Sequence, residues 1–415
     1  MINEQLYICW RLTKAFIQSI PFYLFRVVPI NPDRIVFTTI EGTTGFTCNP
    51  KYIALEAIKL IVRDNKKYEL IWLVDDTTKV FPEEIKKVKN TLINRAFYLS
   101  TAKFWIDNSR KQLECRKRKG QIYIQTWHAK LGFKPTCLDR GASFSRIAYL
   151  VSKHDSDMVD YWLSNSDWYD NTLKTGSLYE GKTLRTGSPR CDCLVKASKE
   201  RELKDKIKTG LVERFGLYQD NTKSIDNVHF LMYAPTFRGG NQNIDRKLAS
   251  DQHAPDYNLL LSSLEKRFGG TWFILLRLHP QMTVRGIKAT DSKDLYSKKC
   301  IDVSKVDDMY EILAGCDAFM TDYSSSAFDA AVMNIPIFLY CDDYSDYENE
   351  RGKLLWDLKK LPFPMATDTR QLQQVIEEFD ENAYLASLKR LWEENKIIED
   401  GKASKRVVDF IQSTN

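Results

Sequence analysis

The sequence TDYSSS occupies positions 321–326, between an apolar run at Cys316–Met320 and a second one at Ala327–Met333. We predict that the first run is a strand and the second a helix, with the hydroxyl-rich segment as the turn between them. The start of a helix presents unpaired backbone N–H groups and the positive end of the helix dipole, so hydroxyls placed there favour phosphate binding. A serine N-cap is the simpler alternative, but one serine is enough for a cap.

The alternation of apolar strands with helices continues on both sides of this turn. In the second half we predict strands at Val228–Tyr233, Thr271–Leu278 and Ile335–Tyr340, with helices at Tyr257–Phe268 and Thr369–Phe379. The first half carries the same pattern, with strands at Arg34–Thr39, Leu70–Val74, Ile122–Gln125, Tyr161–Leu163 and Thr183–Arg185. Strands that alternate with helices predict parallel sheets, and 415 residues are too many for one hydrophobic core.

We therefore expect an α/β protein with two domains, at residues 31–195 and 196–380, that face each other across a central cleft. A preceding segment covers residues 1–30, and closing helices cover residues 381–415. In domains of this kind ligands bind outside the carboxyl ends of the parallel strands. No G-x-G-x-x-G follows the first strand, so the fingerprint of a dinucleotide site is absent.

The composition is that of an ordinary globular protein, with 43% hydrophobic and 28% charged residues. A net charge of +6 is compatible with an anionic membrane surface or a polyanionic substrate, and no motif indicates nucleic-acid binding. The nine cysteines include no C-x-x-C pair and suggest reduced thiols in a cytoplasmic protein. No spacing of metal ligands stands out, so we expect neither a metal site nor a cofactor.

Residues 1–30 are rich in aromatic and aliphatic side chains, interrupted by Arg11, Lys14 and Arg26. The uncharged stretch from Ala15 to Phe25 is too short to cross a bilayer. It suits an amphipathic helix that lies in the membrane interface. A helix that packs on the first domain of the protein itself is the alternative, and the sequence leaves both open.

Three candidate residues follow predicted strands, where ligands of parallel sheets bind. His128 comes after the strand Gln121–Thr126, and its pKa range suits a base that accepts a hydroxyl proton. His279 follows the strand Phe273–Leu278, and Arg238 follows Val228–Tyr233; both suit contacts with a phosphate. The structural alternatives are a histidine packed behind Trp127, a strand cap and a surface arginine.

Taken together, the motifs resemble those of the CDP-glycerol glycerophosphotransferase family, which makes teichoic acids and similar capsule polymers. The resemblance covers about residues 33–410. It is carried by short motifs that are weak singly but specific in their joint order: Asn49–Tyr52, Trp105–Asn108, Gln125–His128, Gly187–Arg190, Tyr233–Arg238, Arg277–Pro280, Thr321–Ser326 with Phe328 and Asp329, Arg351–Gly352 and Asp400–Ser404. It implies a GT-B architecture of two Rossmann-like domains. It also implies transfer of a polyol phosphate from a CDP-activated donor to a hydroxyl of a polymer or lipid-linked glycan acceptor, with release of CMP. Peripheral attachment to the cytoplasmic face of the cell membrane is a further implication.

The resemblance and the strand-end positions together suggest separate roles for the candidate residues in catalysis, donor binding and acceptor binding. The expected catalytic residues are His128, which deprotonates the acceptor hydroxyl, and His279, which helps to hold the pyrophosphate and to stabilise the CMP leaving group. The donor phosphates and nucleotide are expected to contact Arg238, Thr321, Ser324, Ser325 and Ser326. Gly45, Lys130 and Arg190 are expected to hold the acceptor or to form a hinge. We expect Asp322 and Asp329 to brace the serine-rich turn, and Arg277 to be structural.

Two features leave the substrate open. Ala129 stands after His128 where the family often has glycine, which puts the acceptor in doubt. The sequence does not distinguish a CDP-glycerol from a CDP-ribitol donor, a primase from a polymerase, or wall teichoic acid from capsule. A glycosyltransferase that uses a nucleotide sugar and a non-catalytic polymer-binding protein of the same fold are the alternative functions.

Overall fold

The computed structural model describes residues 4–64, 67–217, 225–236, 254–278, 299–351 and 353–414. The chain forms two compact units. Unit 1 comprises Met1–Lys130, Pro135–Asp192 and Lys396–Asn415, and unit 2 comprises Leu131–Lys134 and Cys193–Asn395. The segment 381–415, which we grouped as closing helices, is therefore shared between the units.

Unit 1 contains a sheet of seven strands in the order β3-β2-β1-β4-β5-β6-β7, and every pair of neighbours is parallel. The strands are β1 (Asn31–Thr38), β2 (Glu69–Val74), β3 (Ile85–Lys89), β4 (Ala102–Asp107), β5 (Ile122–Gln125), β6 (Tyr161–Ser164) and β7 (Lys182–Arg185). The helices are α1 (Glu4–Leu24), α2 (Cys48–Asp64), α3 (Leu92–Thr101), α4 (Arg146–Met158), α5 (Asp167–Ser177) and α15 (Ala403–Thr414). Short 3₁₀ turns lie at η1 (Phe25–Val27), η2 (Ile40–Gly42), η3 (Cys137–Ser143) and η4 (Pro189–Cys191).

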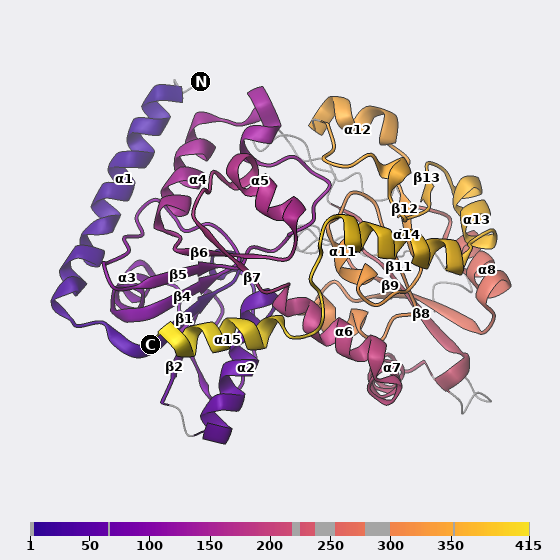
Figure 1. Cartoon of the computed structure of the whole chain (residues 1–415), viewed down its shortest axis with the longest axis horizontal. Coiled ribbons are helices and arrows are strands. Elements are labelled where there is room, and N and C mark those ends of the chain that lie inside the picture. The colour runs from indigo at the N-terminus through magenta and orange to yellow at the C-terminus, as the bar shows by residue number, and fades with distance from the viewer. Residues whose placement is uncertain are drawn as a thin grey trace. The chain divides into compact units, whose positions relative to one another are not determined.

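Both faces of the unit 1 sheet are buried, as Figure 1 shows with α2 and α15 on one side and α4 and α5 on the other. Alternate residues of the central strands supply two cores, one containing Val36 and Trp105 and the other Phe37 and Trp72. Burial on both faces explains why these strands are continuously apolar in sequence. Phe22 of α1 belongs to the first core, so the amino-terminal helix is anchored on unit 1.

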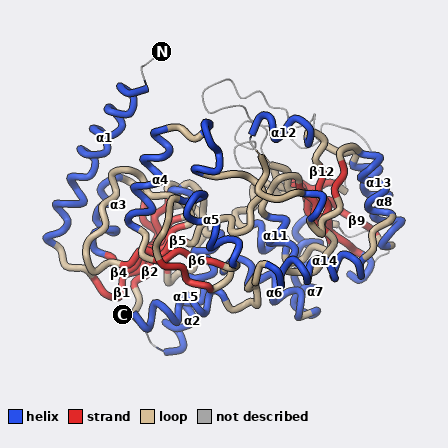
Figure 2. Tube along the Cα trace, turned by 45° about the horizontal axis from the view of Figure 1, so that its top comes forward, coloured by secondary structure: helices blue, strands red, loops and turns tan. Residues whose placement is uncertain are grey.

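Unit 2 contains a parallel sheet of six strands in the order β10-β9-β8-β11-β12-β13. Figure 2 labels two of these strands, β9 and β12, which are drawn in red among the blue helices of the unit. Its strands are β8 (Val228–Tyr233), β9 (Thr271–Leu276), β10 (Cys300–Asp302), β11 (Ala318–Thr321), β12 (Ile337–Tyr340) and β13 (Met365–Ala366). The helices beyond the unit boundary are α6 (Asp192–Lys199), α7 (Arg201–Phe215), α8 (Tyr257–Phe268), α10 (Met309–Leu313), α11 (Ser326–Ala331), α12 (Tyr344–Arg351), α13 (Thr369–Glu377) and α14 (Glu381–Glu394). Turns η5 (Ile225–Asn227) and η7 (Leu358–Lys360) complete the described part.

The central strands and the edge strand β7 (Lys182–Arg185) agree with the prediction, and three other edge strands were missed. The bounds of β5, β8 and α8 coincide with those predicted from the sequence. The edge strands β3, β10 and β13 were not predicted, because they are short or, like IKKVK in β3, polar at most positions. Among the described residues, no helix is long and apolar enough to cross a membrane.

Candidate active site

Hydrogen bonds of the side chain of Gln125, here called the Gln125 clamp, fix the direction in which the chain leaves β5. The Gln125 side chain accepts a hydrogen bond from the Trp127 N–H at 2.9 Å. Its Nε2 donates to the Ser109 carbonyl at 2.9 Å and to the Tyr123 hydroxyl at 2.8 Å. Trp127 has φ 49°, a left-handed conformation that costs a non-glycine residue about 1–3 kcal/mol. Gln125 thus holds a strained turn that positions the next residue, His128.

The imidazole of His128 is fixed in one tautomer. Its Nδ1 lies 2.9 Å from the carbonyl oxygen of Asn108. A carbonyl can only accept, so Nδ1 carries the hydrogen and Nε2 carries the lone pair. The ring stacks on Trp127 with centroids 4.6 Å apart, which fixes its plane. This is the arrangement that a base needs: one nitrogen anchored and the other available to accept a proton.

The electrostatic surroundings keep His128 neutral. Burial lowers the pKa of His128 to about 4, and the positive charges of Arg190, Arg110 and Lys130 act in the same direction. The hydrogen bond to Asn108 opposes this shift but is the smaller effect. His128 is therefore unprotonated at neutral pH. An anionic substrate beside these cations would offset their charge and raise the pKa toward the working range of a base.

Lys130 is tied to the loop that carries His128. The half-buried loop ends at Lys130, whose buried ammonium donates to the Thr126 carbonyl at 2.7 Å. Burial lowers the pKa of Lys130 to about 8, although the negative charge of Glu399 opposes the shift. In this structure the ammonium closes the loop 126–130, and its predicted contact with the acceptor stays a prediction.

Asn49 joins three segments that are distant in sequence. Its Nδ2 donates to the Trp127 carbonyl at 2.7 Å, and its Oδ1 accepts from the Arg190 N–H at 3.0 Å. Arg190 is buried and its Nη1 lies 3.5 Å from the Cys48 sulfur. The predicted site residues His128, Lys130 and Arg190 are thus brought together in unit 1. Gly45 lies in the loop before α2, where its carbonyl accepts the Thr39 hydroxyl at 3.1 Å.

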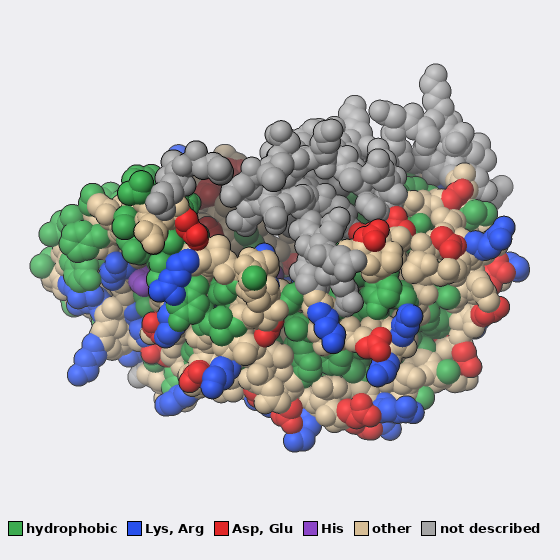
Figure 3. Space-filling model, turned by 90° about the horizontal axis from the view of Figure 1, so that it is seen from above, with side chains coloured by type: hydrophobic (Ala, Val, Ile, Leu, Met, Phe, Trp, Pro, Cys, Tyr) green, Lys and Arg blue, Asp and Glu red, His purple; other side chains and the backbone are tan. Residues whose placement is uncertain are grey.

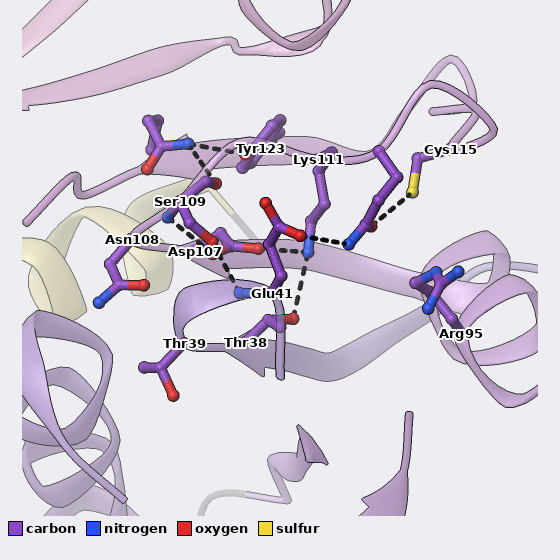
Figure 4. A network of polar contacts seen from close by, with 12 residues as sticks. Thr38, Thr39, Glu41, Arg95, Asp107, Asn108, Ser109, Lys111, Cys115 and Tyr123 are labelled. Atoms are coloured by element: carbon purple, nitrogen blue, oxygen red, sulfur yellow. Dashed lines mark hydrogen bonds and ion pairs between the residues drawn. The ribbon is translucent and has the colours of Figure 1, made fainter. Parts of the chain in front are cut away.

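A buried polar network supports the segment that holds the His128 ring. Figure 4 shows the Lys111 ammonium directed at Asp107, 2.5 Å away, and at the Thr38 hydroxyl, 3.1 Å away. Asp107 also accepts from the N–H and the hydroxyl of Ser109, at 2.9 and 3.1 Å. Both charged partners are almost completely buried. The network fixes residues 107–111 and, with them, the carbonyl of Asn108.

Asp155 links this network to the Gln125 clamp. Its Oδ1 accepts from the Lys111 N–H at 2.8 Å and from the Tyr123 hydroxyl at 2.9 Å. That hydroxyl in turn accepts from Gln125. Burial raises the pKa of Asp155 to about 6. A continuous chain of buried hydrogen bonds therefore runs from α4 to the turn before His128.

In unit 2 the serine-rich turn is braced by carboxylates, as predicted. Asp322 accepts from the Thr236 N–H at 2.9 Å and from its hydroxyl at 2.9 Å, which ties the turn to the segment after β8. Asp329 accepts from the Tyr310 hydroxyl at 2.7 Å. Arg277 has the structural role that was predicted: its guanidinium donates a hydrogen bond to the carbonyl of Ser304 at 2.9 Å.

The hydroxyls of the turn are not equivalent. Thr321 donates its hydroxyl hydrogen to the Ala234 carbonyl at 2.6 Å, so that hydrogen is already engaged. Ser326 donates to the Ser324 hydroxyl at 2.8 Å. Ser325 occupies the N-cap position of α11 without a side-chain capping bond. Phosphate binding at this turn stays a prediction, and Arg238 and His279 lie outside the described residues.

Some residues of unit 1 were missed because their roles depend on the fold. Asn108 and Asn49 were noted only as parts of motifs, and neither was expected to hold His128. Glu399 accepts from Asn165 at 2.8 Å and from the Ser188 N–H at 3.0 Å, which ties the carboxyl-terminal segment to the turn after β7. The described residues contain no group of three or more His, Cys, Asp or Glu side chains arranged to hold a metal ion.

Two units, each built on a parallel α/β sheet, are the architecture expected of the GT-B class. Comparison with solved structures agrees: the wall teichoic acid polymerase TagF is 25% identical, with a TM-score of 0.75 over 99% of this chain and 97% of that chain. The predicted fold class is thereby confirmed.

A family model for CDP-Glycerol:Poly(glycerophosphate) glycerophosphotransferase matches residues 20–413, and the chain belongs to that family. A teichoic acid poly(glycerol phosphate) polymerase of Bacillus spizizenii is 27% identical over 95% of this chain and 95% of its own length. A polymerase of the same name from Staphylococcus epidermidis is 27% identical over 92% of this chain. The match spans only 51% of that longer relative. Relatives named for ribitol phosphate are also similar.

Proposed function

We propose that the chain transfers glycerol phosphate from CDP-glycerol to a hydroxyl of a teichoic-acid-like or capsular polymer, or of a lipid-linked acceptor, and releases CMP. Membership of the glycerophosphotransferase family supports this reaction, and similarity to glycerol phosphate polymerases supports the donor. The observation that carries the proposal is the hydrogen bond from His128 Nδ1 to Asn108, which leaves Nε2 as a proton acceptor.

In the proposed step, the acceptor oxygen attacks the β-phosphorus of the donor. The bond between that phosphorus and the bridging oxygen breaks, and CMP leaves with the electron pair. The acceptor proton moves to Nε2 of His128. Phosphoryl transfer of this kind depends mainly on positioning and charge stabilisation, so a neutral imidazole suffices as the base.

The donor phosphates are assigned to the start of α11 and its surroundings. Ser324, Ser325 and Ser326 offer hydroxyls at the positive end of the α11 dipole, and Thr321, Arg238 and His279 complete the proposed set. The proposal requires the carboxyl edges of both sheets to face one cleft. It assigns no metal and no cofactor.

The acceptor side is assigned to Gly45, Lys130 and Arg190, with the chain at the cytoplasmic face of the cell membrane. The exposed apolar side chains of α1 support this attachment, because they include Leu6, Phe16 and Leu24, each more than 60% exposed. Burying such side chains in the membrane interface is favourable, whereas exposing them to water is not.

The test measures nucleotide release with a defined glycan acceptor: CMP from CDP-glycerol and CDP-ribitol, and UDP from UDP-sugars. His128→Ala should lower turnover on the order of a hundredfold or more with CDP-glycerol, since a positioned base is lost. Lys59→Gln, an exposed change on α2, is the matched control and should leave turnover unchanged. Turnover only with CDP-ribitol would transfer the proposal to ribitol phosphate, and turnover only with UDP-sugars would refute it.

A further inference from the structure

A pocket of about 280 Å³ lies beneath the amino-terminal helix of unit 1, away from the residues assigned to catalysis. The helix α1 forms one wall, with Trp10, Arg11, Lys14, Ala15 and Gln18. The other wall consists of Arg95 on α3 and of residues 112–114. The volume is just below the range of about 300–1,000 Å³ that holds drug-sized ligands, so the pocket suits a small polar group.

The pocket carries an excess of positive charge. Arg11, Lys14 and Arg95 line it, and Glu114 is the single acidic residue in the lining. Arg95 is bound to Glu114 at 2.6 Å and to Asn90 at 3.1 Å, but its buried Nε has no hydrogen-bond partner. Among the described residues, neither Arg11 nor Lys14 forms an ion pair: Arg11 contacts the Tyr7 hydroxyl, and Lys14 lies over the Trp10 ring. The lining therefore has more cations than acidic side chains and favours an anionic ligand.

The exposed face of the same helix is apolar, which favours an anion that is attached to a lipid. Hydrophobic side chains gather at the end of the molecule where α1 lies (Figure 3). Trp10 is 56% exposed and lines the pocket, while Phe16 and Ile17 are 67% and 57% exposed. Aromatic and aliphatic side chains of an interfacial helix enter the boundary between head groups and acyl chains, and its cations stay at the level of the lipid phosphates.

We propose that this pocket binds the phosphodiester head group of an anionic glycerophospholipid. The phosphate lies against Arg11, Lys14 and the guanidinium of Arg95, while Trp10 and its exposed neighbours pack on the acyl chains. The inference rests on the proposed membrane attachment and deepens it from general adhesion to recognition of one head group. A free phosphodiester has the same charge chemistry, so the experiment must separate the two sources.

The experiment measures binding of the full chain to vesicles of phosphatidylcholine alone and to vesicles that also contain phosphatidylglycerol. Arg11→Gln with Lys14→Gln should weaken binding to the anionic vesicles about fivefold for each cation removed. Lys59→Gln with Lys405→Gln removes two exposed cations on α2 and α15 and is the matched control.

A charge-neutral variant tests the pocket rather than the surface charge. Gln18→Trp should fill the cavity and abolish the preference for phosphatidylglycerol, while Gln374→Trp, on α13, should not. An unchanged preference in Gln18→Trp would overturn the inference, as would a wild-type chain that binds both vesicles equally. Soluble glycerophosphoglycerol added to the anionic vesicles should compete for the protein only at concentrations far above that of the lipid. Competition at equal concentration would mean that the acyl chains contribute nothing to binding, and it would also overturn the inference.

The outcomes separate this inference from the proposals on which it rests. Failure to bind any vesicle would refute membrane attachment and the lipid pocket together. Two results would refute the pocket alone: vesicle binding with no preference for phosphatidylglycerol, or a preference that Gln18→Trp leaves intact. CMP release by Gln18→Trp with a soluble acceptor should equal that of the wild type, so a loss of the transfer reaction would be visible independently.

Discussion

The lowered pKa of His128 predicts an unusual pH dependence of the transfer reaction. In the free protein burial and three neighbouring cations lower this pKa to about 4, compared with about 6.5 for an ordinary histidine. At pH 5 about 90% of His128 is then unprotonated, compared with about 3% for the ordinary group. A base must be unprotonated to work, so kcat/KM should be about thirtyfold higher at pH 5 than an ordinary histidine would allow.

The assay is CMP release at donor concentrations far below KM, from pH 4.5 to 8, where kcat/KM reports the free enzyme. We expect kcat/KM to fall with decreasing pH only near pH 4. Lys130→Met removes one of the cations that lower the pKa and should move the acid limb upward. The assignment of His128 as the base would be refuted if the kcat/KM of the wild type fell already between pH 6 and 7 and Lys130→Met did not change that fall.

Three further predictions concern the support of the site. Asp155→Asn should become more stable relative to wild type by about 2 kcal/mol as the pH rises from 4 to 8, because the raised pKa of Asp155 makes the folded wild type bind more protons than the unfolded state in this range. A pH-independent difference in paired urea denaturation curves would contradict it. Lys111→Met should cost about 3–5 kcal/mol, since it leaves the buried Asp107 carboxylate uncompensated. Thermal unfolding checks this, with Lys59→Met, an exposed position on α2, as the control. Gly187→Ala should lower the melting temperature and Gly210→Ala should not, because Gly187 has φ +90° and a Cβ there would lie 2.8 Å from the Ile398 carbonyl, whereas Gly210 has open space.

The strands and the catalytic candidate could be predicted because their signals are local. A continuous apolar run such as Val228–Tyr233 indicates a strand buried on both faces, whatever its neighbours are. A histidine directly after such a run lies at the carboxyl edge of the sheet, where ligands bind. Position along the chain and residue type were therefore enough to select His128.

The partners of His128 could not be predicted, because they depend on strand order and register. β4 and β5 are neighbours, and Asp107 is paired with Gln125. That register places the residue after Asp107 beside the turn that follows Gln125, which is how Asn108 reaches the imidazole. Asn49 and Arg190 come from two other segments, and no local pattern indicates that they meet at Trp127.

The same contacts explain why a histidine of such low pKa is useful as a base. A pKa of about 4 ensures a vacant Nε2 but makes the free imidazole a weak proton acceptor. The cations that lower the pKa are also those that an anionic diphosphate would neutralise, so donor binding should raise the pKa of His128. Proton abstraction would then become favourable only when donor and acceptor are both present. Titration of His128 by NMR with and without CDP-glycerol tests this, and an unchanged pKa on donor binding would mean that the diphosphate does not approach the imidazole.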